Sequence, residues 1–267
     1  MATLGDRGEA PPKGFKRHEY SVNGVKTVVH VGGQGRPVVY WHGAGAWHGI
    51  DFARPWTERF KVIAPFHPGW GDSGDEPRLD CMREYLLHYL DLFDQLNLAQ
   101  FDLVGFSLGG WMAAEFAVAH GHRVRKLVLV APAGLQDPAN PGPPMGGWTL
   151  DEMYAHLVSD VSLLEPYLPH RPEEAEHHKA AIAREMQSTG RLASQGAFNP
   201  HLERWLHRAT MPTLLVWSKA DRIAPYGRSA KWMELLPNAK LATFEQAGHL
   251  VLDELEEARE SVAKFLA

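Results

Sequence analysis

The sequence predicts an α/β protein with a mostly parallel central sheet flanked by helices and an inserted helical cap. Three observations lead to this prediction. Short apolar runs alternate with helical patterns along most of the chain, which is typical of parallel strands joined by helical crossovers. Several runs are almost continuously apolar, as strands buried on both faces must be. Residues 135–207 interrupt the alternation and contain no convincing strand.

Length and composition are those of a globular protein with one core. The chain has 267 residues, near the upper limit for a single hydrophobic core, so one domain with a sizeable insertion is expected. The formal net charge of −5 offers no attraction for nucleic acid or an acidic membrane surface. We therefore expect a small-molecule substrate and no nucleic-acid or membrane partner, and the sequence leaves a homo-oligomer open.

The sequence shows no pattern typical of a signal peptide or a membrane helix. The first twenty residues have no apolar core of the kind a signal peptide needs, and no run approaches the ~20 apolar residues of a membrane helix. Cys81 is the single cysteine, so no intrachain disulfide can form. These features predict a cytoplasmic protein in which Cys81 is a bystander.

The first part of the chain predicts a loose terminus, three strands and a helix. Residues 1–14 are polar and rich in Gly and Pro. Val25–Val31 and Pro37–Trp41 are predicted as strands joined in a hairpin across "GGQGR". Lys61–Phe66 is a third apolar run, and Glu84–Leu98 repeats its apolar residues at helical spacing.

The remaining core elements continue the alternation. They are a strand over residues 101–106, a helix over Leu108–His120, strands over Lys126–Pro132, Pro212–Trp217 and Lys240–Glu245, and a closing helix over Leu255–Leu266. The core domain is thus predicted to comprise residues 15–134 and 208–267.

The cap is predicted to comprise residues 135–207. It opens with a Pro/Gly-rich linker, "QDPANPGPPMGG", and continues with two helical patterns over residues 150–164 and 173–187. A cap over the site favours small or medium, partly apolar substrates over polymers.

Ser107 lies in "GFSLG", between a strand and a helix. This is the G-x-S-x-G arrangement, which holds a serine on a tight turn where small residues let strand and helix approach closely. A structural serine in a glycine-rich turn is the alternative. The strand before it and the helix after it favour a nucleophile.

A serine nucleophile needs a base, an acid that orients the base, and N–H groups for the developing oxyanion. Asp221 follows the strand that ends at Trp217, and His249 follows the last strand, in "AGH". Ser, Asp, His is the chain order of one well-known triad arrangement. The predicted oxyanion donors are the backbone N–H groups of Ala44, in "WHGAG", and Leu108.

These motifs, together with "HPGWGDSG" and "PTLLVWSKADRIAP", resemble those of the α/β-hydrolase fold superfamily, among its cap-containing, esterase-like serine hydrolases. The resemblance implies a cofactor-independent enzyme. The "GNS" elbow and the Trp after the catalytic His of ring-cleavage C–C hydrolases are absent, since Phe106 precedes Ser107 and Leu250 follows His249. Ser218 stands where the family often has Gly.

Other residues near these motifs are candidates for a pocket. His42 is expected to fix the oxyanion loop, and His67 to be structural or to border the pocket. Trp47, Trp111 and Trp148 are more typical of packing, although Trp47 adjoins the oxyanion loop and is a candidate pocket wall.

Metal and nucleotide sites are not predicted. "GWGDSG" matches G-x-G-x-x-G, but "DEPRLD" follows it where a dinucleotide site needs a helix. His177 and His178 are neighbours on a predicted helix and point about 100° apart, so they make a poor ligand pair and are expected on a solvated face.

The sequence therefore predicts a serine hydrolase that cleaves a small or medium carboxylic ester through an acyl-enzyme. Cleavage of a C–C bond or a lactone by the same triad is the alternative within enzymes. A ligand-binding receptor with slow turnover is the alternative outside them, and the complete triad with its oxyanion loop favours the enzyme.

Overall fold

The computed structural model describes residues 12–194 and 196–267, so residues 1–11 of the predicted loose terminus lie outside the description. Eight strands form one sheet in the order β1-β2-β4-β3-β5-β6-β7-β8. The strands are β1 (Phe15–Val22), β2 (Val25–Gly32), β3 (Pro37–Trp41), β4 (Lys61–Pro65), β5 (Phe101–Phe106), β6 (Val124–Val130), β7 (Thr213–Ser218) and β8 (Ala239–Phe244). β1 and β2 are antiparallel to their neighbours and the other six strands are parallel, which confirms the predicted α/β class.

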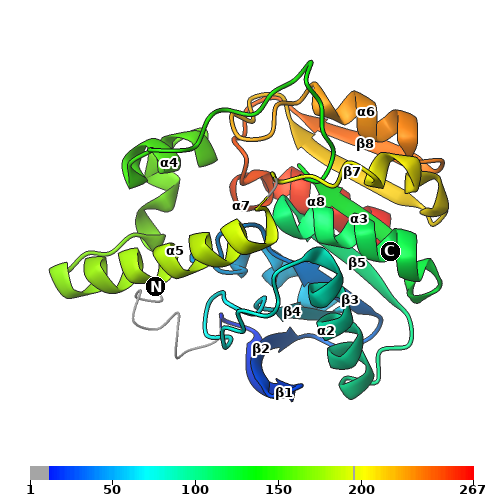
Figure 1. Cartoon of the computed structure of the whole chain (residues 1–267), viewed down its shortest axis with the longest axis horizontal. Helices are drawn as coiled ribbons and strands as arrows, with labels where there is room; N and C mark the ends of the chain where they lie inside the picture. The colour runs from blue at the N-terminus through cyan, green and yellow to red at the C-terminus, as the bar shows by residue number, and fades with distance from the viewer. Residues whose placement is uncertain (1–11, 195) are drawn as a thin grey trace.

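Helices cover both faces of the sheet (Figure 1). One face packs against α2 (Met82–Gln95), α3 (Leu108–His120) and α6 (Arg228–Leu235). The other packs against the 3-10 helix η1 (Asp51–Glu58), α7 (Val251–Glu254) and α8 (Glu256–Leu266). Every residue of β5 and β7 is buried, which explains why their sequences lack the alternation of a half-exposed strand.

Successive residues of a central strand enter different cores, because strand side chains alternate between the two faces. On β5, Leu103 belongs to the core beneath α2 and α3, whereas Val104 belongs to the core beneath η1 and α8. Leu127 and Val128 on β6 divide in the same way. The parallel strands therefore hold two hydrophobic cores apart and contribute to both.

The predicted hairpin between Val25–Val31 and Pro37–Trp41 is wrong. β4 lies between β2 and β3, so the "GGQGR" connection crosses over a strand. The actual hairpin joins β1 to β2, with Val22 paired to Val25 across Asn23 and Gly24. Both turn residues have positive φ, 50° and 83°, as the tight Asn-Gly hairpin turn requires.

The chain between β6 and β7 is mostly helical, and we call residues 135–207 the β6–β7 segment. It contains α4 (Leu150–Leu157), η3 (Val161–Tyr167), α5 (Pro172–Leu192), η4 (Leu202–Arg204) and η5 (Leu206–Arg208). The last residue of η5 lies just beyond the segment. Its described residues form no strand, and a single bridge pairs Gly134 with Phe198. α4 and α5 extend beyond one end of the sheet (Figure 1).

The solvated face expected for His177 and His178 is half correct. His177 is exposed, but His178 is buried and its Nε2 lies 2.7 Å from the hydroxyl of Tyr154 on α4. Because adjacent helix residues point about 100° apart, one of them enters the packed side of α5 while the other faces water. Among the described residues, no helix is long and apolar enough to cross a bilayer.

Candidate active site

Ser107 stands on the turn between β5 and α3. Its φ of 52° and ψ of −114° are unusual for a residue with a side chain. Three backbone hydrogen bonds hold it there. Its N–H donates to the carbonyl of Val130 at 2.9 Å, and its carbonyl accepts from the N–H groups of Trp111 at 3.1 Å and Ala133 at 3.0 Å.

Two glycines make this turn possible by close backbone approach. A Cβ on Gly105 would lie 2.4 Å from the carbonyl oxygen of Gly109, and a Cβ on Gly109 would lie 2.3 Å from that of Trp41. Such distances leave no room for any side chain. The glycines of "GFSLG" therefore bring α3 against the ends of β5 and β3.

His249 connects Ser107 to Asp221. Its Nδ1 lies 2.8 Å from Oδ2 of Asp221, and its Nε2 lies 3.0 Å from Oγ of Ser107. An ionised carboxylate can only accept, so Nδ1 carries the proton and Nε2 is left to accept from the serine hydroxyl. The structure thus brings together the three residues predicted from the sequence, hydrogen-bonded in the order Ser107, His249 and Asp221.

The carboxylate of Asp221 is held on its other side as well. Its Oδ1 accepts the backbone N–H groups of Ile223 and Ala224, each at 2.8 Å. The residue is buried, and these two bonds fix which oxygen faces His249. The loop after β7 therefore holds the carboxylate of Asp221 in one orientation.

The loop after β3 is fixed by His42. The backbone N–H of His67 donates to Nε2 of His42 at 3.0 Å, so the proton of His42 is on Nδ1. Nδ1 then donates to the carbonyl of Gly43 at 2.8 Å. Because the C=O and N–H of a trans peptide point in opposite directions, this bond also sets the direction of the Ala44 N–H.

His67 completes the support beneath this loop. Its Nε2 lies 3.0 Å from the carbonyl of His42, and its Nδ1 bonds to the hydroxyl of Tyr89. Burial lowers the pKa of His67 to about 3 and that of His42 well below its ordinary value, so both imidazoles are neutral. Protein groups occupy all four ring nitrogens, an arrangement consistent with the loop-fixing role expected for His42 and with the structural alternative expected for His67.

The two residues predicted as oxyanion donors belong to the loop that touches Ser107 and to the position directly after it. A Cβ on Gly43 would lie 3.2 Å from Cβ of Ser107, so the loop carrying Ala44 touches the elbow. The indole Nε1 of Trp70 donates to the carbonyl of Ala44 at 2.7 Å and holds the next peptide. Leu108 is the first residue of α3, so its N–H belongs to the turn whose N–H groups lack partners within the helix.

The three tryptophans proposed for the pocket have different surroundings. Trp47 extends from the loop after β3 to the β6–β7 segment, where its ring centroid lies 5.2 Å from that of Tyr154. Trp148 stacks on His156, at 4.1 Å between ring centroids. Trp111 is buried and donates to Glu115 at 3.0 Å, which is a packing role.

The β6–β7 segment contacts the loops that carry Asp221 and His249. The N–H of Leu250, next to His249, donates to the carbonyl of Leu157 at 3.0 Å. The guanidinium of Arg222, next to Asp221, donates to the carbonyl of Val158 at 2.7 Å. Consecutive carbonyls of one segment thus bind both loops.

Two glutamates that sequence reasoning missed tie the segment to the site. Glu254 accepts the N–H of Gly248 at 2.7 Å and that of Ser159 at 2.9 Å. Glu185, on α5, accepts the N–H of Ala46 at 3.0 Å. A signal for Glu185 existed, because helical spacing places it on the same face of α5 as the buried Ile182.

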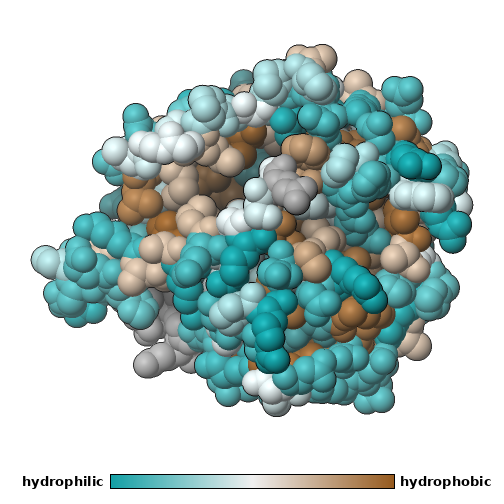
Figure 2. Space-filling model, viewed as in Figure 1, coloured by the Kyte–Doolittle hydropathy of each residue, from teal (hydrophilic) through white to brown (hydrophobic). Residues whose placement is uncertain are grey.

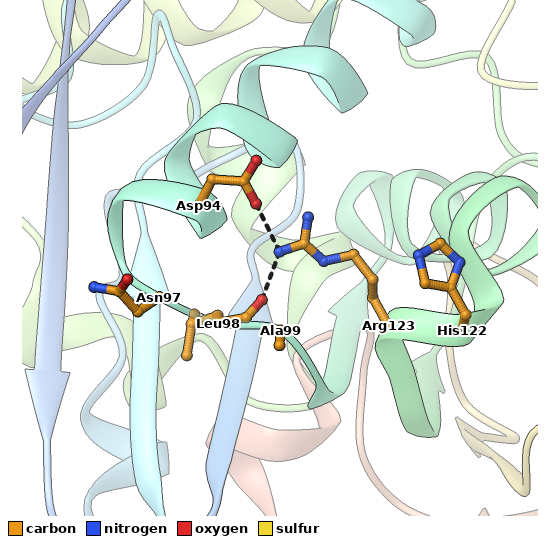
Figure 3. A pocket seen from close by; sticks show the side chains of 6 residues that line it. All are labelled: Asp94, Asn97, Leu98, Ala99, His122 and Arg123. Carbon is orange, nitrogen blue, oxygen red and sulfur yellow. Dashed lines mark hydrogen bonds and ion pairs between the residues drawn. The ribbon is translucent and has the colours of Figure 1, made fainter.

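The molecular surface is hollowed between the segments of α4 and α5, and the hollow has apolar colouring (Figure 2). A different pocket lies at the opposite end of β5, between α2 and the turn after α3. It is lined by Asp94, Asn97, Leu98, Ala99, His122 and Arg123. Figure 3 shows Arg123 closing it with bonds to Asp94 and the carbonyl of Leu98. This pocket therefore lies at the end of β5 that is opposite to Ser107.

Metal and nucleotide sites do not emerge from the described part of the chain. Within residues 12–194 and 196–267, no three His, Cys, Asp or Glu side chains are grouped as metal ligands. The "GWGDSG" stretch is a turn closed by the N–H of Gly69 on the carbonyl of Gly74, at 2.9 Å, and the next helix begins only at Met82.

Comparison with known sequences identifies relatives over nearly the whole chain. A model described as the alpha/beta hydrolase family matches residues 38–265. The chain is 30% identical to the 2-hydroxymuconate semialdehyde hydrolase of Pseudomonas putida, over 91% of this chain and 92% of that protein. It is 26% identical to a 2-hydroxy-6-oxo-2,4-heptadienoate hydrolase of Pseudomonas putida, over 85% and 87%.

Solved structures share the fold. A membrane phospholipase A, described as a bacterial virulence factor, superposes with a TM-score of 0.81 at 24% identity, covering 95% of this chain and 86% of that one. A meta-cleavage product hydrolase of Pseudomonas fluorescens superposes with a TM-score of 0.77 at 21% identity, covering 93% and 96%.

Proposed function

The chain belongs to the alpha/beta hydrolase family and is a hydrolase, and from this premise we propose that it cleaves a small or medium carboxylic ester through Ser107. One observation carries the proposal. The hydroxyl of Ser107, the imidazole of His249 and the carboxylate of Asp221 are joined by hydrogen bonds of 3.0 and 2.8 Å. This arrangement is the one a serine needs to act as a nucleophile.

The reaction has two stages. Oγ of Ser107 attacks the ester carbonyl while Nε2 of His249 takes the hydroxyl proton, and Asp221 stabilises the imidazolium. The tetrahedral intermediate collapses, and the imidazolium gives its proton to the departing alkoxide. Water then attacks the acyl-enzyme, with His249 again taking the proton, and the acid leaves as Ser107 is regenerated.

The oxyanion is stabilised by the N–H groups of Ala44 and Leu108. The Ala44 N–H is aimed in advance by the bond from His42 to the Gly43 carbonyl. The Leu108 N–H lies at the positive end of α3. Donors that are already in place need no reorganisation when the charge develops.

We also propose that the β6–β7 segment acts as the cap. Its contacts with Leu250, Arg222 and Ala46 support a position over the site, and so does the apolar hollow between α4 and α5 (Figure 2). A cap limits the length of the acyl chain and excludes water. Short esters should therefore be cleaved faster than long-chain triglycerides, without stimulation at an oil–water interface.

An alkyl fluorophosphonate tests the nucleophile. The probe should label the protein once, at Ser107, and Ser107→Ala should lose both labelling and ester turnover while its circular dichroism and melting temperature stay near wild type. Ser162→Ala, at an exposed serine of η3, is the matched control and should be labelled normally. Labelling at another serine, or turnover by Ser107→Ala, would contradict the assignment.

Hydrolysis of a C–C bond is the second candidate, and the relatives named above favour it, since they are named as hydrolases of 2-hydroxymuconate semialdehyde and 2-hydroxy-6-oxo-2,4-heptadienoate and a similar structure is a meta-cleavage product hydrolase. The same triad would attack a ketone, and the leaving group would be a carbon stabilised as a dienolate, which must be protonated on carbon. The residues flanking the triad weaken this candidate, because Phe106 and Leu250 replace the Asn and Trp of ring-cleavage hydrolases.

A substrate panel separates the two candidates. It should compare p-nitrophenyl acetate and butyrate, a γ-lactone and a 2-hydroxy-6-oxo-dienoate at equal enzyme concentration. The ester proposal predicts the highest kcat/KM for the short esters. A kcat/KM for the dienoate exceeding that for the esters tenfold or more would replace the ester proposal by C–C hydrolysis.

A further inference from the structure

Glu185 is a buried carboxylate that the hydrolytic steps above do not use. It lies on α5, within the β6–β7 segment, and is only 2% exposed. Its Oε2 accepts the N–H of Ala46 at 3.0 Å, and its Oε1 accepts the N–H of Gly71 at 3.2 Å. The two donors belong to the loops that follow β3 and β4, so one side chain binds both loops.

The peptide held by Glu185 is close to the proposed oxyanion donor. Along this loop, the Gly43 carbonyl is held by His42, the Ala44 carbonyl by Trp70, and the Ala46 N–H by Glu185. The peptide that contains the Ala44 N–H and the two peptides after it are therefore each held by a side chain. Of these ties, only that from Glu185 comes from the β6–β7 segment.

We infer that Glu185 is a positioning residue for the oxyanion hole. It couples the seating of α5 to the orientation of the Ala44 N–H by holding Ala46 and Gly71 together. The inference rests on the proposed function, because it assigns a task to Glu185 in the same acyl-transfer step. The β6–β7 segment then completes the catalytic geometry as well as covering the site.

The carboxylate is better suited to this task than a neutral side chain. A carboxylate presents two acceptor oxygens, which matches two backbone N–H donors, whereas an amide would turn its NH₂ group toward one of them. Burial raises the pKa of Glu185, while the two N–H groups and the nearby guanidinium of Arg184 act to lower it. Each oxygen of this buried side chain is matched with one backbone N–H, as a buried polar group requires.

A simpler role for Glu185 would be to dock α5. The chain offers a matched control, because Arg191 on the same helix forms an ion pair with Asp75 in the loop after β4. Arg191→Gln removes a tie between α5 and that loop without touching the loop of Ala44. A docking role predicts equal effects at both positions, whereas a positioning role predicts an effect at Glu185 alone.

The test uses the full chain and the phosphonylation of Ser107 by an alkyl fluorophosphonate, whose phosphoryl oxygen needs the same N–H donors. We expect Glu185→Gln to lower kinact, and kcat for p-nitrophenyl acetate, by on the order of tenfold to hundredfold. KI and KM should stay within about twofold of wild type, because the ground state makes little use of the donors. Arg191→Gln should leave all four constants within about twofold.

Glu185→Asp provides a second variant in case the glutamine protein does not fold. It keeps the charge but draws the carboxylate back by one methylene, so it cannot reach both loops, and an intermediate loss of kinact is expected. Unchanged kinact in the folded Glu185 variants, or equal losses in Arg191→Gln, would overturn the inference alone. Absence of Ser107 labelling in the wild-type protein would overturn the proposed function and this inference with it.

Discussion

Ser107 adopts a backbone conformation that costs free energy, of order 1–3 kcal/mol for a residue of this kind. Hydrogen bonds to Val130, Trp111 and Ala133 hold it there, so the conformation does not depend on a ligand. The same bonds point the side chain toward His249. At the scale of single residues, the site is thus assembled before any substrate enters.

Asp221→Asn tests the acid at this scale. The amide oxygen can still accept from Ile223 and Ala224, so the NH₂ group faces Nδ1 of His249. Donor would then face donor, and the imidazole must move its proton to Nε2, where it can no longer accept from Ser107. We expect kcat for ester hydrolysis to fall by ~10⁴ with a small change in KM.

Asp137→Asn is the control for that substitution. Asp137 accepts from Ala139 and Asn140 in a turn of the β6–β7 segment and has no contact with His249. Its kcat should stay within about twofold of wild type. The reverse pattern would place the acid of the triad in the segment and remove Asp221 from it.

The site residues that were predictable and those that were not differ in the physics that places them. Ser107, Asp221 and His249 each follow a parallel strand, and strand ends meet at one edge of a sheet, so sequence order alone brings them close. Glu185 reaches the oxyanion loop only through tertiary packing of α5. Its helical spacing predicts burial, but no local pattern names Ala46 and Gly71 as its partners.

Elements were predictable where burial is complete. β5 and β7 are buried along their whole length, β6 is buried over residues 127–130, and α3 spans the same residues that the sequence predicted. β1 was missed because it is an edge strand whose middle residues are mostly exposed, so "FKRHEYSV" lacks a clear apolar pattern. The Asn-Gly pair at its end was the local signal that could have revealed it.

Gly109→Ala tests the close approach of α3 to the sheet. A Cβ there would lie 2.3 and 2.4 Å from the carbonyl oxygens of Trp41 and His42, which are backbone atoms that cannot turn aside. We expect the free energy of unfolding in urea to fall by at least ~3 kcal/mol. Ester turnover should fall with it, because α3 also carries Leu108.

Gly190→Ala on α5 is the matched comparison. Nothing lies within 4 Å of the Cβ it would gain, and its φ is not in the left-handed region. Alanine favours a helix interior over glycine, so this variant should be more stable than wild type by about 0.5–1 kcal/mol. A destabilised Gly190→Ala, or a tolerated Gly109→Ala, would contradict the packing described for these helices.

For the molecule as a whole, buried histidines set the response to acid. Burial lowers the pKa of His67 to about 3 and those of His30 and His88 to about 4, below the ordinary value of 6.5. Between pH 6.5 and these lowered pKa values, the unfolded chain therefore binds protons that the folded protein does not bind. The contribution of these three histidines to stability is fully present above pH 6.5 and is lost as the pH falls toward 3 to 4.

Urea unfolding between pH 5 and pH 6 measures this effect. Each buried imidazole should lower the free energy of unfolding by about 1.4 kcal/mol for each pH unit of acidification. His88→Gln should reduce the slope by that amount, whereas His170→Gln, at an exposed position, should not. An unchanged slope in His88→Gln would show that His88 is protonated in the folded protein.

The division of the sheet into two cores has a consequence for how the molecule comes apart. Neighbouring residues such as Leu103 and Val104 anchor opposite layers on a single strand, so neither layer can melt while the other persists. A calorimetric scan of the protein should show one endotherm whose calorimetric and van't Hoff enthalpies agree. Amide hydrogens of β5, β6 and β7 should then exchange together, at a rate set by global opening.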